Sequence, residues 1–158
     1  MPLPLLEIER ALYARLMADI ARSGRGVKEA GAFLLGSIAP ETRKATSYIM
    51  YDMVALESSR KHAYVAFTSQ EMARAWEMCY ASGLQVVADI HSHPQGPQQS
   101  LSDRANPIVS LPGHVALIAP FFAMRNPQPV DLGVHIFEGA GRWRSMFQAE
   151  ARNTISLT

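Results

Sequence analysis

The order of apolar and polar residues along the chain predicts strands that alternate with a few helices. Apolar residues at helical spacing predict an amphipathic helix over residues 5–21, which a glycine-containing stretch at 23–26 ends. A second helix is expected over residues 69–81, capped by Ser69 and stopped at Gly83. Its predicted apolar face consists of Met72, Ala75, Trp76, Cys79 and Tyr80. We expect the first helix to pack on a sheet and Cys79 to be an ordinary core residue.

Runs of apolar or alternating residues predict the strands of that sheet. Two runs are mostly apolar and typical of buried strands, at residues 30–38 and 84–90. Further strands are expected near 45–54, 62–68, 114–120, 130–138 and 142–147, and residues 55–61 form a polar connection. Residues 149–158 form a polar tail that either docks or frays. The order of elements predicts a mixed sheet covered by helices, in the α/β or α+β class.

Composition and charge narrow the class of protein. A chain of 158 residues fits one domain, and 48% apolar with 18% charged residues indicates neither disorder nor a membrane protein. The net charge of +1, with no basic stripe, argues against partners such as nucleic acid or anionic membranes. A single cysteine excludes an internal disulfide framework and fits a reducing compartment. Because no signal sequence is recognisable, we expect a cytoplasmic protein.

The candidate chemistry follows the second buried strand. His91 and His93 lie at its end on the same face, so both imidazoles can bind one ion. Pro94 and a loop of Gln, Gly and Pro turn the chain back, which can bring Asp103 to the same ion. Two histidines and one carboxylate favour zinc and leave its fourth position open for water, as in catalytic sites.

Other polar residues have simpler interpretations. Ser100 and Asp103 have the spacing of a helix cap and a first-turn carboxylate, and the helix they predict is short because Pro107 follows. Such a helix would also hold a ligand carboxylate rigidly. His62, His114 and His135 fall in predicted strands without a partner at ligand spacing. We expect these three histidines to have structural or surface roles.

The motif resembles the signature of the JAMM (MPN+) metalloproteases. That signature is His-x-His-Pro, a loop, Ser-x-x-Asp and an upstream glutamate on a strand. The matching residues are His91 to Pro94, Ser100, Asp103 and Glu29, and Glu29 precedes Gly36 by the interval that the family has. Five residues separate the proline from the serine, where the family usually has six. The resemblance covers residues 27–119.

The resemblance implies a fold and a set of roles. The fold would be a curved, barrel-like sheet with zinc at one end of its central strands. His91, His93 and Asp103 would hold one zinc ion, and Glu29 would be the general base that later delivers the proton to the departing amine. Ser100, with Ser102 as the second candidate, would donate a hydrogen bond to the oxyanion.

The resemblance also implies a substrate class. The most similar family members are small bacterial proteins, some encoded beside E1-like and E2-like enzymes in antiviral operons. By analogy, this chain would be a zinc isopeptidase that cleaves after the C-terminal glycine of a ubiquitin-like protein, its conjugate or its precursor. The segment 56–68 is the candidate strand edge for the extended tail.

Two alternative functions remain open, and a third is more distant. A hydrolase of the same fold could act on a sulfur-carrier protein or a short peptide. A scaffold that has lost catalysis is a further class, against which the intact motif argues. A DNA-associated role, known in other bacterial relatives of the fold, lacks a basic surface.

Overall fold

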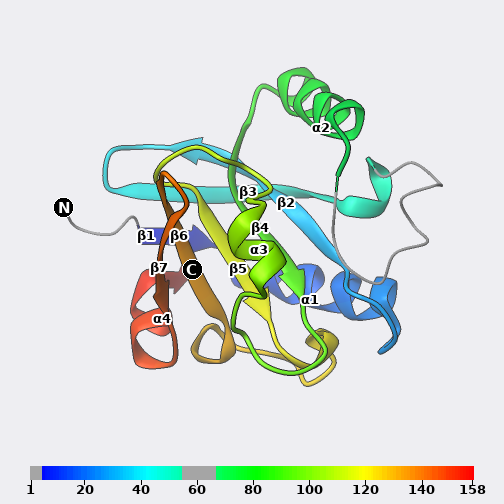
Figure 1. Cartoon of the computed structure of the whole chain (residues 1–158), viewed down its shortest axis with the longest axis vertical. Coiled ribbons are helices and arrows are strands. Elements are labelled where there is room, and N and C mark those ends of the chain that lie inside the picture. The colour runs from blue at the N-terminus through cyan, green and yellow to red at the C-terminus, as the bar shows by residue number, and fades with distance from the viewer. Residues whose placement is uncertain (1–4, 55–66) are drawn as a thin grey trace.

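Within residues 5–54 and 67–158, which the computed structural model describes, eight strands form one curled mixed sheet (Figure 1). In sheet order the strands are β7 (Arg142–Met146), β6 (Gly133–Gly139), β5 (Val115–Ala119), β4 (Gln85–Ser92), β2 (Gly31–Ile38), β3 (Thr42–Met50), β1 (Leu5–Ile8) and β8 (Ile155–Leu157). β4 pairs with β5 in parallel, as β1 does with β3 and β8, whereas the other neighbours are antiparallel. The mixed, half-barrel sheet expected from the sequence is confirmed.

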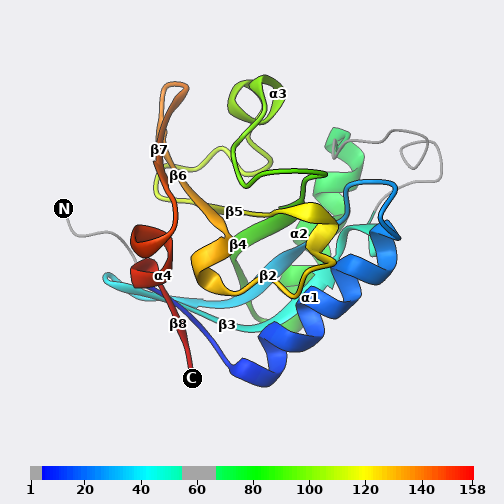
Figure 2. The ribbon, with the colours of Figure 1, turned by 90° about the horizontal axis from the view of Figure 1, so that it is seen from below.

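Helices cover both faces of this sheet (Figure 2). α1 (Arg10–Gly24) contributes Leu16 and Ile20 to a core that also contains Leu34, whereas α2 (Ser69–Ser82) packs in a second core with Phe33. Neighbouring residues of a strand point to opposite faces, so one strand supplies both cores. Two short helices complete the fold, α3 (Leu101–Ala105) and α4 (Ala149–Thr154). The 3-10 turns within the described ranges are η1 (Tyr51–Met53), η3 (Phe121–Ala123) and η4 (Pro129–Asp131).

The first predicted helix was wrong at its start. Residues Leu5–Ile8 form β1, and the helix spans only Arg10–Gly24. Leu6 and Ile8 alternate with less buried neighbours. This period of two places both side chains on one face of the sheet, where they are buried in the larger core. The predicted helical spacing used Leu5 and Ile8 at its start, and both of these residues lie in β1. The predicted end of the helix is confirmed, because Arg25 adopts the left-handed conformation at its C-cap.

The polar tail expected at residues 149–158 docks as regular structure. It forms α4 and β8, whose backbone pairs in parallel with β1. The amide of Thr158 donates to the Ile8 carbonyl at 3.0 Å, and the Arg10 amide donates to the Thr158 carbonyl at 3.0 Å. Ala151 and Ile155 are buried in the larger core. These two apolar residues anchor a segment whose composition is otherwise polar.

The helix predicted at 69–81 is confirmed as α2, with two corrections. Its cap is Thr68 rather than Ser69, because the Thr68 hydroxyl accepts a hydrogen bond from the Glu71 amide at 3.1 Å. Tyr80 does not belong to the apolar face, since 81% of its surface is exposed. Cys79 is buried, as expected, and burial raises the pKa of its thiol.

The remaining strand predictions hold with shifted boundaries. β3 covers 42–50 rather than 45–54, and residues 129–131 form η4 instead of the start of β6. The predicted connection 55–61 and the strand at 62–68, including His62, lie outside the described residues except for Phe67 and Thr68, which are not in a strand. None of the helices in the described part of the chain has the length and hydrophobicity needed to cross a membrane.

Candidate metal centre

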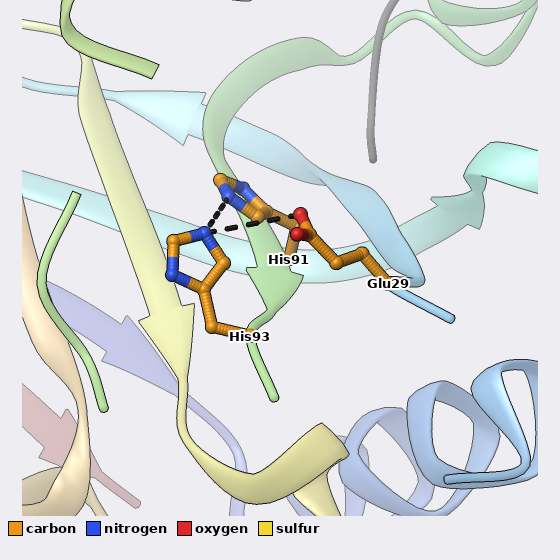
Figure 3. A group of neighbouring side chains, drawn as sticks. All are labelled: Glu29, His91 and His93. Carbon is orange, nitrogen blue, oxygen red and sulfur yellow. Dashed lines mark hydrogen bonds and ion pairs between the residues drawn. The ribbon is translucent and has the colours of Figure 1, made fainter. Parts of the chain in front are cut away.

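The candidate site lies where the central strand β4 ends. β4 is buried from its second residue to its end, and it is flanked by β2 and β5. His91 is the seventh residue of β4 and pairs with Gly31 of β2 and with Ile118 of β5. β2 is antiparallel to β4, so the start of one strand lies beside the end of the other. Glu29, two residues before β2, therefore reaches the two histidines (Figure 3).

Four predicted side chains converge at this point. The Nε2 atoms of His91 and His93 lie 3.0 Å apart. The Asp103 carboxylate places Oδ2 3.0 Å from Nε2 of His93 and Oδ1 3.4 Å from Nε2 of His91. Glu29 Oε1 lies 3.8 Å from Nε2 of His93, and Glu29 and both histidines each offer a donor atom within 4.8 Å of the others.

These separations fit a shared metal ion. Ligand atoms at about 2.0–2.2 Å from a tetrahedral zinc are about 3.3–3.6 Å from one another. The two imidazole Nε2 atoms are 3.0 Å apart, and different oxygens of the Asp103 carboxylate lie 3.4 Å from His91 and 3.0 Å from His93, at or slightly below that range. Glu29 lies slightly farther away, at 3.8 Å, on the same side as His93. His91, His93 and Asp103 thus form a close set, and the Glu29 carboxylate lies at the edge of this set.

Neighbouring charges and hydrogen bonds shift the pKa of both His91 and Asp103. Burial acts to lower the pKa of His91, but the hydrogen bond and charge of Asp103, with the charges of Asp89 and Glu29, raise it overall. Burial acts to raise the pKa of Asp103, yet hydrogen bonds from His91 and His93 outweigh it and hold that pKa far below its usual value. Asp103 is therefore ionised and ready to bind a cation.

A short helix carries Asp103, the predicted third ligand. Ser100 caps α3 with its hydroxyl, which accepts from the Asp103 amide at 3.1 Å, while Asp103 Oδ2 accepts from the Ser100 amide at 2.9 Å. This is the capping box that the sequence predicts. The indole of Trp143 on β7 donates to the Arg104 carbonyl at 3.0 Å and so ties α3 to the sheet.

Ser100 and Ser102, the candidate oxyanion donors, both belong to this turn. The Ser100 hydroxyl acts as an acceptor in the cap, so its proton is still available for donation to a substrate. Ser102 lines a groove that Asp103 also borders. Both serines belong to the turn that carries Asp103, and the choice between them stays a prediction.

The base candidate is positioned through Ser92, the residue between the two histidines. Its hydroxyl accepts from the Ala30 amide at 3.0 Å, and its own amide donates to the Ala30 carbonyl at 2.8 Å. Gly31 is required next to this clamp, because a Cβ there would lie 2.2 Å from the Ile90 carbonyl oxygen. The backbone beside Glu29 therefore lies directly against β4.

A strained turn fixes the backbone of His93. The His93 amide donates to the Ala119 carbonyl at 2.9 Å, and its carbonyl accepts from the Phe122 amide at 2.8 Å. Phe121, Phe122 and Ala123 all have positive φ, between 54° and 60°. Such a left-handed turn costs roughly 1–2 kcal/mol per residue. No glycine in the sequence signals it.

A buried aspartate–histidine pair next to the site was not predicted from the sequence. Asp89 and His114 are 1% and 3% exposed, and Oδ2 of Asp89 lies 2.6 Å from Nε2 of His114. His114 precedes β5 and has the structural role expected of it, as does His135, which is buried in β6. The available signal was an aspartate inside an otherwise apolar strand, two residues before His91.

Comparison with known proteins identifies the family. Residues 9–130 match the model of the prokaryotic homologs of the JAB domain. The chain belongs to this prokaryotic JAB family. It is also 26% identical, over 94 residues that make up 60% of the chain, to a probable metalloprotease, y4jG, of Sinorhizobium fredii. The match spans 58% of that relative's own length.

Two solved structures share the fold of this JAB domain. A protein from Desulfitobacterium hafniense superposes with a TM-score of 0.67 at 18% identity, over 98% of this chain and 93% of its own. A protein from Salinibacter ruber superposes with a TM-score of 0.59 at 18% identity, over 89% of this chain and 88% of its own. The family resemblance inferred from the motif is confirmed, and with it the JAB/MPN-like architecture.

Proposed function

We propose that this JAB domain is a zinc metallopeptidase that hydrolyses the amide bond after the C-terminal glycine of a ubiquitin-like protein. The observation that carries the proposal is the convergence of His91, His93 and Asp103, with Glu29 at the edge of the set. Two imidazoles and one carboxylate are a typical catalytic ligand set for zinc. The family and the similarity to a probable metalloprotease support the same reaction class.

Each residue has a distinct role in the proposed reaction. His91, His93 and Asp103 would hold the ion, which supplies a Lewis acid that polarises a carbonyl and makes water nucleophilic near neutral pH. Glu29 would accept the proton of the attacking water and pass it to the departing amine. Ser100, or Ser102 in its place, would donate a hydrogen bond to the oxyanion.

A groove beside the site supports a polypeptide substrate. It has a volume of about 750 Å³ and runs between α2 and α3, bordered by Met72, Trp76 and Ile108 on its apolar side. Asp103 and Ser102 lie along the same groove, so a bound chain would pass the proposed ligand and the second oxyanion candidate. A tail ending in glycine suits such a passage, because glycine brings the scissile carbonyl close without a side chain.

The partners belong to the same proposal. The substrate would be a ubiquitin-like protein, its conjugate or its precursor, and E1-like and E2-like enzymes encoded nearby would form the conjugates. The operon setting and the antiviral role are part of this proposal by analogy with similar bacterial proteins. Neither nucleic acid nor a membrane is expected to take part.

The test combines metal content with cleavage. Wild type should contain about one zinc per chain by elemental analysis, His91→Ala and Asp103→Ala should lose it, and Glu29→Gln should keep zinc while losing at least about 100-fold in rate. Zinc-free wild type prepared under chelator-free conditions would refute the metallopeptidase.

The substrate is tested separately with a panel of fusions. Ubiquitin-like proteins extended beyond their terminal glycine should be cleaved at that glycine, and matched fusions in which the glycine is replaced by valine should resist. Cleavage of a sulfur-carrier fusion or of short peptides alone would replace the ubiquitin-like substrate with the alternative class. A zinc-loaded protein that cleaves none of them would favour the scaffold class.

A further inference from the structure

A polar chain lies beneath the first histidine of the proposed zinc site. Asp89 is on β4 two residues before His91, so the two side chains share one face of the strand. Both are buried, at 1% and 4% exposure. Asp89 Oδ2 pairs with Nε2 of His114 at 2.6 Å, and Oδ1 lies 3.4 Å from the Tyr51 hydroxyl. One oxygen of Asp89 is thus fully engaged, while the other makes only a long contact.

His91 presents a nitrogen toward this region that has no hydrogen-bond partner among the described residues. Its Nε2 points to the proposed ion, and its Nδ1 is buried without a partner. The Oε1 of Gln99 is a second buried atom in the same condition. An imidazole that binds a metal through Nε2 carries its proton on Nδ1, and that N–H normally donates to an acceptor.

A small cavity adjoins these groups. It has a volume of about 20 Å³ and is bordered by Asp89, His91, Gln99 and His114, with Trp143 and Asp103 at its edge. A cavity needs about 10–15 Å³ to accommodate one water, which usually makes two to four hydrogen bonds. This space accommodates one water and no larger ligand.

Resting on the zinc site of the proposed function, we propose that Asp89 and Gln99 bind one water that accepts the Nδ1 hydrogen of His91. The water has two hydrogens to donate, and Asp89 Oδ1 and Gln99 Oε1 are the two acceptors that border the cavity. His114 donates to the opposite oxygen of Asp89 and orients the carboxylate. Asp89, Gln99 and His114 are therefore positioning residues that fix His91 as an Nε2 ligand.

The first test measures zinc affinity of the purified protein by competition with a chromophoric chelator. Asp89→Asn removes the charge, and Gln99→Leu removes one acceptor from a loop residue; each should raise the zinc Kd about tenfold. Tyr13→Phe is the matched control, because it loses a buried hydrogen bond of 2.7 Å to Pro127 far from the site. Its zinc Kd should equal that of the wild type.

Coupling separates a bridging water from a merely structural role. Because both residues act through one water, the double variant should weaken binding by clearly less than the product of the two single effects. Multiplicative effects would overturn the shared water, and single variants within about twofold of wild type would overturn the positioning role. Zinc binding that is absent in the wild type itself would instead refute the proposed function.

A measurement on the wild type does not depend on any variant. In zinc-loaded protein labelled with nitrogen-15, the Nδ1 hydrogen of His91 should give a resolved, slowly exchanging resonance with a nuclear Overhauser effect to water. In Gln99→Leu this resonance should be lost to exchange with solvent. This comparison does not need Asp89→Asn, so it holds whether or not that variant folds. A His91 Nδ1 hydrogen that exchanges rapidly in the wild type, or that shows no contact with water, would overturn the inference.

Discussion

Acid should destabilise this domain partly through His135, a buried histidine of β6. Its Nε2 lies 3.0 Å from the Pro97 carbonyl oxygen and its Nδ1 lies 2.7 Å from the Ser145 hydroxyl. A carbonyl can only accept, so Nε2 carries the hydrogen and Nδ1 accepts from the serine. The neutral ring satisfies both contacts. Burial lowers the pKa of His135 to about 4, although the bond to Pro97 acts to raise it.

The sign and size of the effect follow from this lowered pKa. In the unfolded chain His135 binds a proton below its ordinary pKa of about 6.5, whereas in the folded protein it stays neutral down to about 4. Between these values the unfolded state binds more protons, so stability falls as pH falls. The full difference corresponds to about 3 kcal/mol, which is lost between about pH 6.5 and pH 4.

Urea denaturation in a chelator, followed at several values between pH 7 and pH 4, measures this loss. The free energy of unfolding of wild type should fall about 3 kcal/mol more steeply over this range than that of His135→Gln. Titrations of groups whose charges do not act on His135 cancel in that difference. Ser145→Ala is the control, because it keeps the buried ring and should keep the steep dependence. Parallel curves for wild type and His135→Gln would refute a histidine held neutral by burial.

Three further substitutions test the supports of the site. Trp143→Phe removes the hydrogen bond to the Arg104 carbonyl that anchors α3, and the zinc Kd measured by competition should rise about fivefold. An unchanged Kd would mean that α3 keeps its position without this hydrogen bond. Ser92→Ala leaves the buried Ala30 amide without its side-chain acceptor, which should lower the free energy of unfolding by about 1–3 kcal/mol in urea. Thr68→Ala removes the cap of α2 and should cost about 1 kcal/mol of stability while zinc affinity stays at the wild-type value; weakened zinc binding would contradict the independence of α2 from the ligands.

The candidate site could be predicted because its determinants are local in sequence. His91 and His93 share a face through strand periodicity alone, and the capping box from Ser100 to Asp103 forms within one turn. Glu29 required more, since nothing in its own segment distinguishes it from a solvated glutamate. Its place became predictable only through the family motif, and the antiparallel pairing of β2 with β4 explains that motif physically.

Elements that depend on long-range pairing could not be predicted. β1 and β8 are short strands that are stable only because they complete the same sheet edge, although they lie at opposite ends of the chain. Their residues carry weak local preferences, and a helical interpretation of Leu5 and Ile8 was equally consistent with spacing. The left-handed turn at Phe121–Ala123 is a similar case, because the surrounding structure imposes a conformation that these residues rarely adopt.

The loop between Pro94 and Ser100, one residue shorter than is usual in the family, shows how contacts between distant segments keep the site residues in place. Gly133 lets the loop approach β6 closely, since a Cβ there would lie 2.1 Å from the Pro97 carbonyl oxygen. His135, two residues further along β6, makes a hydrogen bond to the same oxygen. The short loop is thereby drawn onto the sheet, while the capping box still begins at Ser100. Asp103 consequently reaches both imidazoles, at 3.0 and 3.4 Å. The spacing within the cap, rather than the length of the loop before it, determines where the third proposed ligand lies.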